Sequence, residues 1–295
     1  MPSVLEPKAE IGGEPITLPE PTVTPDTLVT AAALWRRLAP ANAARLVDAE
    51  PIEALPAMEE RCQTKEQRER DDRGFCALLF LSYFWSRNEM AYYDGRRRYA
   101  PHGNVRNAVD AFVGAAKGEA GEIATRLTTG RLSLPEWQRS MADYVTNAHV
   151  AAHAVAVGGA KQVTPEIRVR MDDGLRFQFD RLNAFAVDLA DGFLGERAVE
   201  TRARQYAISA AMTYEAGRRD LWQDLASTGI AVQVRNVVDL NAEHCNAADG
   251  VPGCIEESAR GWVDLLNVGS MSSPGARRCA HGCRCRLAYR LKDEG

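Results

Sequence analysis

The side chains best suited to chemistry are cysteines and histidines gathered near the C-terminus. Five of the seven cysteines and two of the five histidines lie in the last 52 residues. Thiolate and imidazole groups are common ligands of tetrahedral zinc, and the same thiols can instead oxidise to disulfides. We predict that four zinc ligands come from the following set: His244, Cys245, Cys254, Cys279, His281, Cys283 and Cys285.

Two observations bear on the chemistry of this cluster. The N-terminus lacks a positively charged segment followed by an apolar run, so we expect no signal peptide and a reducing cytosol. That environment favours zinc, with disulfides as the alternative. Cys283 and Cys285 are close in sequence, and if only one of them binds, His244 or His281 supplies the fourth ligand.

A basic segment overlaps the cysteine cluster. Residues 277–292 contain six arginines and lysines and no acidic residue, although the whole chain has a net charge of −4. A local patch of this kind can contact DNA phosphates or an acidic protein surface, or it can simply be solvated. The predicted contact residues are Arg277, Arg278, Arg284 and Arg286.

A second pair of possible metal ligands lies in the middle of the chain. His149 and His153 have the i, i+4 spacing that places two ligands on one face of a helix. The residues between them are Val-Ala-Ala, with no acidic group. We therefore expect an ordinary helix surface here and not a metal site.

The elements that must hold these residues are mainly helical. Apolar residues recur at helical spacing and are separated by glycines at 130, 158–159 and 192. Ser133 and Glu136 have the pattern of a capping box, and Thr164-Pro165 begins the next helix. After Gly229 the pattern alternates, which predicts short strands near 230–234 and 286–289 that pair with each other.

We divide the chain into four parts. Prolines are dense near the N-terminus, which predicts disorder there. The run 75–85 is apolar but too short to span a bilayer, and it predicts a buried helix or a face that binds a partner. The fold class is mainly α, an antiparallel helical body with a small Cys-rich α+β module of two strands. The parts are a disordered Pro-rich tail (1–24), an N-terminal helical region (25–94), the helical body (95–228) and the Cys/His-rich C-terminal module (229–295).

Several features follow one another in a characteristic order between about residues 95 and 291. They are the Gly130–Glu136 helix start with Trp137, Gly158-Gly159, Thr164-Pro165, the helix with Tyr206 and Tyr214, His244-Cys245, Gly261-Trp262, Pro274-Gly275, Cys279 and Cys283-Arg284-Cys285. This set resembles the minor head proteins of tailed phages and prophages, the group similar to the Mu F and SPP1 head-morphogenesis family. That family usually has His-Cys-x-x-Cys, whereas Cys245 and Cys254 are nine positions apart here.

The resemblance implies a structural protein and not an enzyme. Such a protein would be assembled in the bacterial cytoplasm and carried in the virion. It would associate with the portal vertex and act in head morphogenesis, DNA packaging or ejection. The implied partners are the portal and other head proteins, with DNA as a further candidate, and neither a membrane nor a small-molecule substrate. The alternatives are a zinc-knuckle nucleic-acid adaptor and, less favoured, a zinc-dependent nuclease.

Overall fold

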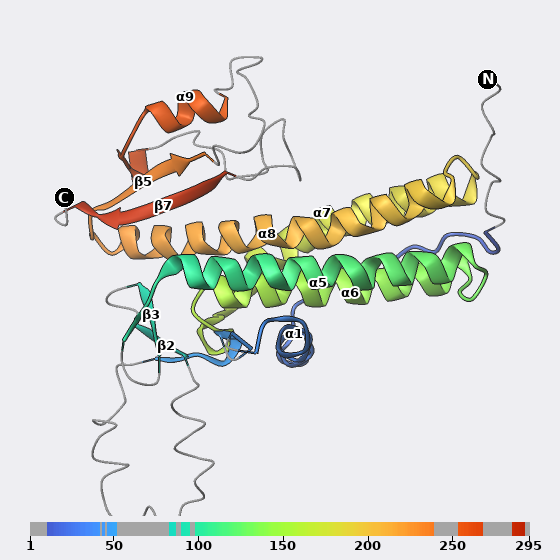
Figure 1. Ribbon diagram of the computed structural model, residues 1–295, viewed down its shortest axis with the longest axis horizontal. Coiled ribbons are helices and arrows are strands. Elements are labelled where there is room, and N and C mark those ends of the chain that lie inside the picture. The colour runs from blue at the N-terminus through green and yellow to red at the C-terminus, as the bar shows by residue number, and fades with distance from the viewer. Residues whose placement is uncertain are drawn as a thin grey trace, which may run out of the picture.

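Four long antiparallel helices form the body of the protein (Figure 1). This computed structural model describes residues 11–41, 43–44, 46–51, 83–86, 90–94, 98–238, 253–267 and 285–292. The helices span most of the predicted helical body and confirm its class. They are α5 (His102–Thr128), α6 (Leu134–Ala156), α7 (Pro165–Ala190) and α8 (Glu196–Ser227).

The sequence signals at the helix ends act as expected. The Ser133 amide donates to the Glu136 carboxylate at 2.8 Å, which closes the predicted capping box. The Thr164 hydroxyl accepts from the amide of Ile167 at the start of α7. Gly130 and Gly192 have positive φ, which lets the chain leave a helix in the left-handed conformation and turn back.

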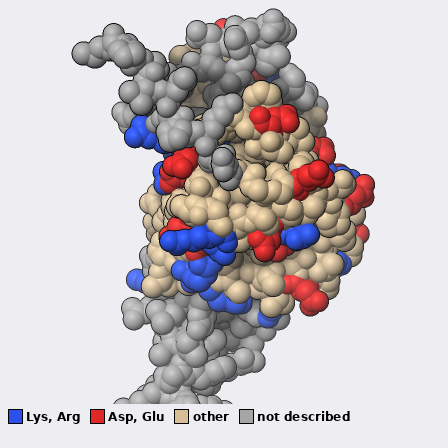
Figure 2. All heavy atoms as spheres, turned by 90° about the vertical axis from the view of Figure 1, so that its right-hand side faces the viewer, with Lys and Arg blue, Asp and Glu red and all other residues tan. Residues whose placement is uncertain are grey.

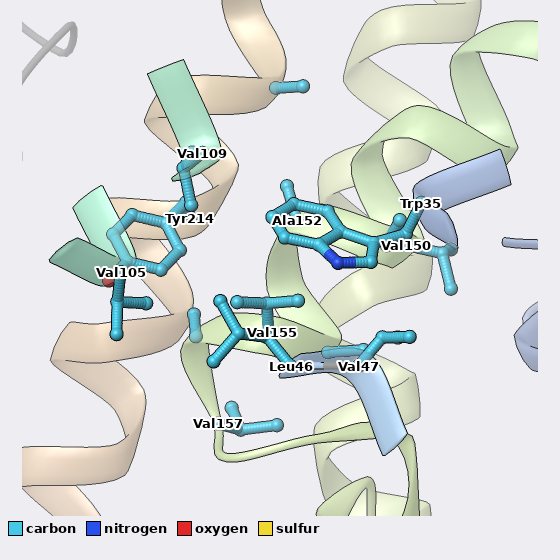
Figure 3. Packing of buried hydrophobic residues seen from close by; sticks show 14 of the residues in the cluster. Trp35, Leu46, Val47, Val105, Val109, Val150, Ala152, Val155, Val157 and Tyr214 are labelled. Carbon is cyan, nitrogen blue, oxygen red and sulfur yellow. The ribbon is translucent and has the colours of Figure 1, made fainter. Parts of the chain in front are cut away.

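The core lies between these helices and a shorter helix, α1 (Pro25–Leu38), which crosses beneath them in Figure 1. Close helix packing depends on small residues of α8, where Ala203, Ala207 and Ala210 are fully buried. Side chains from the N-terminal region complete this core. Figure 3 shows Trp35 and Leu46 of this region in one core with Val109, Val155 and Tyr214 of the long helices.

The segment before α1 corrects the prediction of a disordered tail for residues 11–24. It is extended and lies along the helices, with Leu18 and Val23 buried. The Ile16 amide and carbonyl both bond to the buried amide side chain of Gln138, at 2.9 and 2.7 Å. Proline density favours extension, but the apolar residues between the prolines provide enough contact to hold the segment against the body.

The N-terminal region is not wholly helical as predicted, because it also contains a small sheet. Its strands pair in the order β1-β2-β3-β4, and Trp85 pairs with Tyr92. Aromatic side chains favour strands, which explains why the end of the 75–85 run is a strand and not a helix; residues 75–82 lie outside the described part. The strands are β1 (Glu50–Pro51), β2 (Tyr83–Ser86), β3 (Ala91–Asp94) and β4 (Tyr99–Ala100).

The C-terminal module contains the two predicted strands, β5 (Val232–Val237) and β7 (Arg286–Leu291), paired antiparallel. A third strand, β6 (Val263–Asp264), joins the other side of β5, so the described sheet has three strands where two were predicted. A short helix, α9 (Cys254–Ala259), precedes β6. The module lies beside the C-terminal end of α8 (Figure 1).

Candidate interaction site of the C-terminal module

One face of the module sheet is apolar and packs on the helical body. Val232 and Val234 of β5 and Leu287 of β7 are buried in the main core. Tyr289, on the same face, stacks on Trp222 of α8 with the ring planes 7° apart and the centroids 5.4 Å apart. Since side chains alternate along a strand, this packing directs the intervening residues, which include Arg235, Arg286 and Arg290, to the opposite face.

A buried charged network fixes the module to the body. The Arg218 guanidinium donates to the Leu287 carbonyl at 3.0 Å and lies over the Tyr289 ring. Glu215 bonds to Arg106 of α5 and lies 3.5 Å from Arg218, and its side chain is only 2% exposed. One carboxylate therefore links α5, α8 and, through Arg218, strand β7.

The opposite face of the sheet carries arginines around a tryptophan. Arg235 and Arg290 place their guanidinium carbons 4.9 and 4.5 Å from the centroid of the Trp262 ring. Arg290 also donates to the Gln233 side chain at 2.9 Å, which holds it across the strand pair. Arg286, one of the predicted contact residues, is exposed and has the same strand parity as Arg290.

We call Arg235, Trp262, Arg286 and Arg290 the arginine–tryptophan face. Guanidinium groups bond in a bidentate manner to carboxylates and phosphates, and an indole ring offers a flat stacking surface. This face can therefore contact an acidic protein surface or a nucleic-acid strand. Sequence reasoning missed Arg235, Arg290 and Trp262 as one group, although the alternation around Arg235 was a usable signal.

The end of the helical body away from the C-terminal module carries charges of both signs (Figure 2). Figure 2 looks onto the end where the α5–α6 and α7–α8 turns lie, and basic and acidic side chains are intermixed there. Exposed Arg131 and Arg139, for example, share this end with exposed Glu136. These arginines serve below as controls for the arginine–tryptophan face.

The structure describes two members of the predicted metal site. Cys254 begins α9, is buried, and its carbonyl accepts from the Asn236 side chain at 2.9 Å. Cys285 is also buried and directly precedes β7, where Arg286 pairs with Val237. Both cysteines therefore lie at the same end of the β5–β7 pair, as the predicted strand pairing requires.

The other predicted site residues lie outside the described part of the chain, which leaves zinc and the disulfide alternative as predictions. Within the described ranges, no three His, Cys, Asp or Glu side chains are grouped closely enough to hold a metal ion. The residues concerned are His244, Cys245, Arg277, Arg278, Cys279, His281, Cys283 and Arg284.

The prediction that His149 and His153 lie on an ordinary helix surface is wrong. Both are 3% exposed, because every residue from 148 to 156 is buried in this central helix. His149 bonds to Thr213 at 2.6 Å, and burial lowers its pKa to about 4. His153 packs against Gly217, and burial together with nearby Arg170 lowers its pKa to about 3. The unbroken apolar run around both histidines was the signal of a central helix.

Comparison with known proteins gives no relative: no protein-family model, curated protein or solved structure matches this chain. Among the helices that the structure describes, none is both long and apolar enough to cross a membrane.

Proposed function

We propose that this protein is a structural minor head protein of a tailed phage or prophage, which associates with the portal vertex and acts in head morphogenesis or in DNA packaging or ejection. The proposal rests on the ordered set of features from Gly130 to Cys285 that resembles this family. The proposal implies that the protein is located in the virion and is assembled in the bacterial cytoplasm. Its partners would be the portal and other head proteins.

Within the structure, the arginine–tryptophan face supports this proposal as a candidate contact surface. It lies on the side of the sheet away from the core-forming residues Val234 and Leu287, so the same strands that attach the module also present the arginines. The buried Glu215 network holds the module in a defined position on the body. An assembly protein needs such a surface, which a rigid body presents at a fixed orientation to an acidic partner.

The test is incorporation into heads. A tagged chain is produced during infection with, or induction of, the phage that encodes it, and purified heads are analysed by mass spectrometry. We expect the Arg235→Glu/Arg290→Glu double variant to be lost from heads, because charge reversal repels an acidic partner. The matched control is Arg131→Glu/Arg139→Glu, which makes the same charge change at the other end of the body and is expected to incorporate normally.

Folding of both double variants is checked by circular dichroism and by the urea midpoint of the purified proteins. Equal incorporation of the two folded variants would remove the arginine–tryptophan face from the contact. Complete absence of the wild-type chain from heads would refute the proposed function itself.

A nucleic-acid adaptor is the second candidate, and the pairing of Arg235 and Arg290 with the Trp262 ring is the observation that favours it. Cations and an aromatic ring on one sheet face are typical of surfaces that bind single strands. This function predicts DNA binding that falls steeply with salt and is lost in the Arg235→Glu/Arg290→Glu protein. A head protein that binds only the portal predicts no such binding.

A further inference from the structure

A small cavity lies where α5 begins, beside the N-terminal sheet and α8. Its volume is about 40 Å³, and its walls are largely aromatic. A bound water takes roughly 10–15 Å³ on this measure, so the space suits a group of three or four non-hydrogen atoms. The lining side chains that matter here are Trp85, His102, Tyr214 and Arg218.

One wall residue has a buried donor that lacks an acceptor. Trp85 is 4% exposed, and its indole N–H has no hydrogen-bond partner among the described residues. The ring is held in place, because it packs on the backbone of Gly158 and edge-on against Tyr92. An indole N–H can only donate, and a buried donor without an acceptor is unfavourable. Because Trp85 lines the cavity, a ligand bound there can supply an acceptor for this N–H.

The N-terminal end of α5 lies at this cavity, because its first residue, His102, lines the wall. The N-cap of α5 is Pro101, which supplies no side-chain hydrogen bond, and the first turn of this 27-residue helix has no acidic residue. The positive end of the helix dipole is therefore not compensated by the helix itself. Burial lowers the pKa of His102, the first helical residue, to about 3, and three nearby arginines contribute: Arg218, Arg106 and Arg286.

The acidic groups nearby are already engaged. Glu215 bonds to Arg106 and lies beside Arg218, and Asp110 bonds to Arg106 at 3.0 Å. Both carboxylates therefore have arginine neighbours, and one of these arginines, Arg218, also lines the cavity. The Tyr214 hydroxyl lies 3.2 Å from the His102 ring and provides a further polar atom at the wall.

We infer that this cavity binds a small oxyanion, in the first place a carboxylate group, through the Trp85 indole N–H, Tyr214, Arg218 and the N-terminal end of α5. The donors of the site match the oxygens of the ligand.

The test uses the purified full chain labelled with ¹⁵N-tryptophan. The indole resonance of Trp85 is assigned by its loss in Trp85→Phe and is followed during titration with sodium acetate, sodium phosphate or sodium chloride at constant ionic strength. We expect a saturable shift with an oxyanion and none with chloride. Acetate should bind more tightly than phosphate, whose five non-hydrogen atoms exceed this space, and tighter binding of phosphate would contradict the assignment to a carboxylate.

Substitutions test whether the oxyanion binds in this cavity. Tyr214→Phe removes only a hydroxyl and is expected to fold. It should weaken binding at least threefold, whereas Arg235→Gln, on the face of the sheet that is turned away from the body, should leave binding unchanged. An equal shift with chloride, or unchanged affinity in Tyr214→Phe, would overturn the inference.

Discussion

Replacing Glu215 by Gln tests whether a single buried carboxylate holds the C-terminal module on the helical body. The side chain of Glu215 is 2% exposed, and its partners Arg106 and Arg218 are 15% and 9% exposed. Glutamine keeps the size of the side chain but removes the charge. Both guanidinium groups then remain buried, and Arg218 loses the carboxylate that positions it to donate to Leu287.

The expected cost follows from that burial. Breaking a buried ion pair by changing one partner typically destabilises a protein by about 3–5 kcal/mol, because the remaining charge is left uncompensated. We expect the free energy of unfolding of Glu215→Gln to fall by this amount in urea titrations. The control is Glu200→Gln, which removes an exposed i, i+4 pair with Arg204 and should cost about 0.5 kcal/mol or less.

Hydrogen exchange should identify where the effect lies. Relative to wild type, Glu215→Gln should speed up exchange at the amides of β5 and β7 more than at amides of the far end of the body, since the network contacts Leu287. A loss of less than about 1 kcal/mol, similar to that of the Glu200→Gln control, would refute the view that this network fixes the module.

Three further outcomes are expected. Gly158→Ala should lower the free energy of unfolding by about 2–4 kcal/mol in urea titrations, because φ is +99° and a Cβ would lie 2.6 Å from the Trp85 ring. The control Gly130→Ala also has positive φ but no atom near its Cβ, so it should cost about 1–2 kcal/mol. Equal losses in the two variants would contradict the packing of Trp85 on Gly158. Burial keeps His149 neutral and lowers its pKa to about 4, below the value of 6.5 in the unfolded chain, so the folded state loses stability as the pH falls from about 6.5 to 4. Over that range the free energy of unfolding of wild type, relative to that of His149→Gln, should fall by about 3 kcal/mol. A difference that stays constant with pH would contradict the burial of a neutral histidine. If zinc is bound, Cys279→Ser should reduce the zinc measured by mass spectrometry of the reduced, purified protein, and unchanged metal content would exclude this ligand.

The helical body follows from local signals in the sequence. Ser133 with Glu136 and Thr164 with Pro165 mark helix starts by chemistry that acts within three or four residues. Gly130 and Gly192 mark the turns in the same way, because they adopt positive φ. Such signals need no knowledge of distant residues, and these elements were predicted correctly.

The features that were missed depend on contacts between residues that are far apart in the sequence. The extended segment around Ile16 lies on the body because Gln138, 122 residues away, bonds to its backbone. His149 and His153 are buried because other helices surround α6, which no local spacing reveals. Trp262 meets Arg235 and Arg290 only because the strand register aligns them. Sequence reasoning predicted the paired strands β5 and β7 but not the residues that share their outer face.

The most direct test of the proposed function is the number of copies of this chain in purified heads, measured by quantitative mass spectrometry relative to the portal protein. Heads are collected both before DNA packaging and after nuclease treatment. A minor head protein is expected at a few copies per portal ring in both preparations, independent of DNA. Absence of the chain from heads, or its release when DNA is removed, would contradict the proposed function, and release with DNA would favour the nucleic-acid adaptor instead.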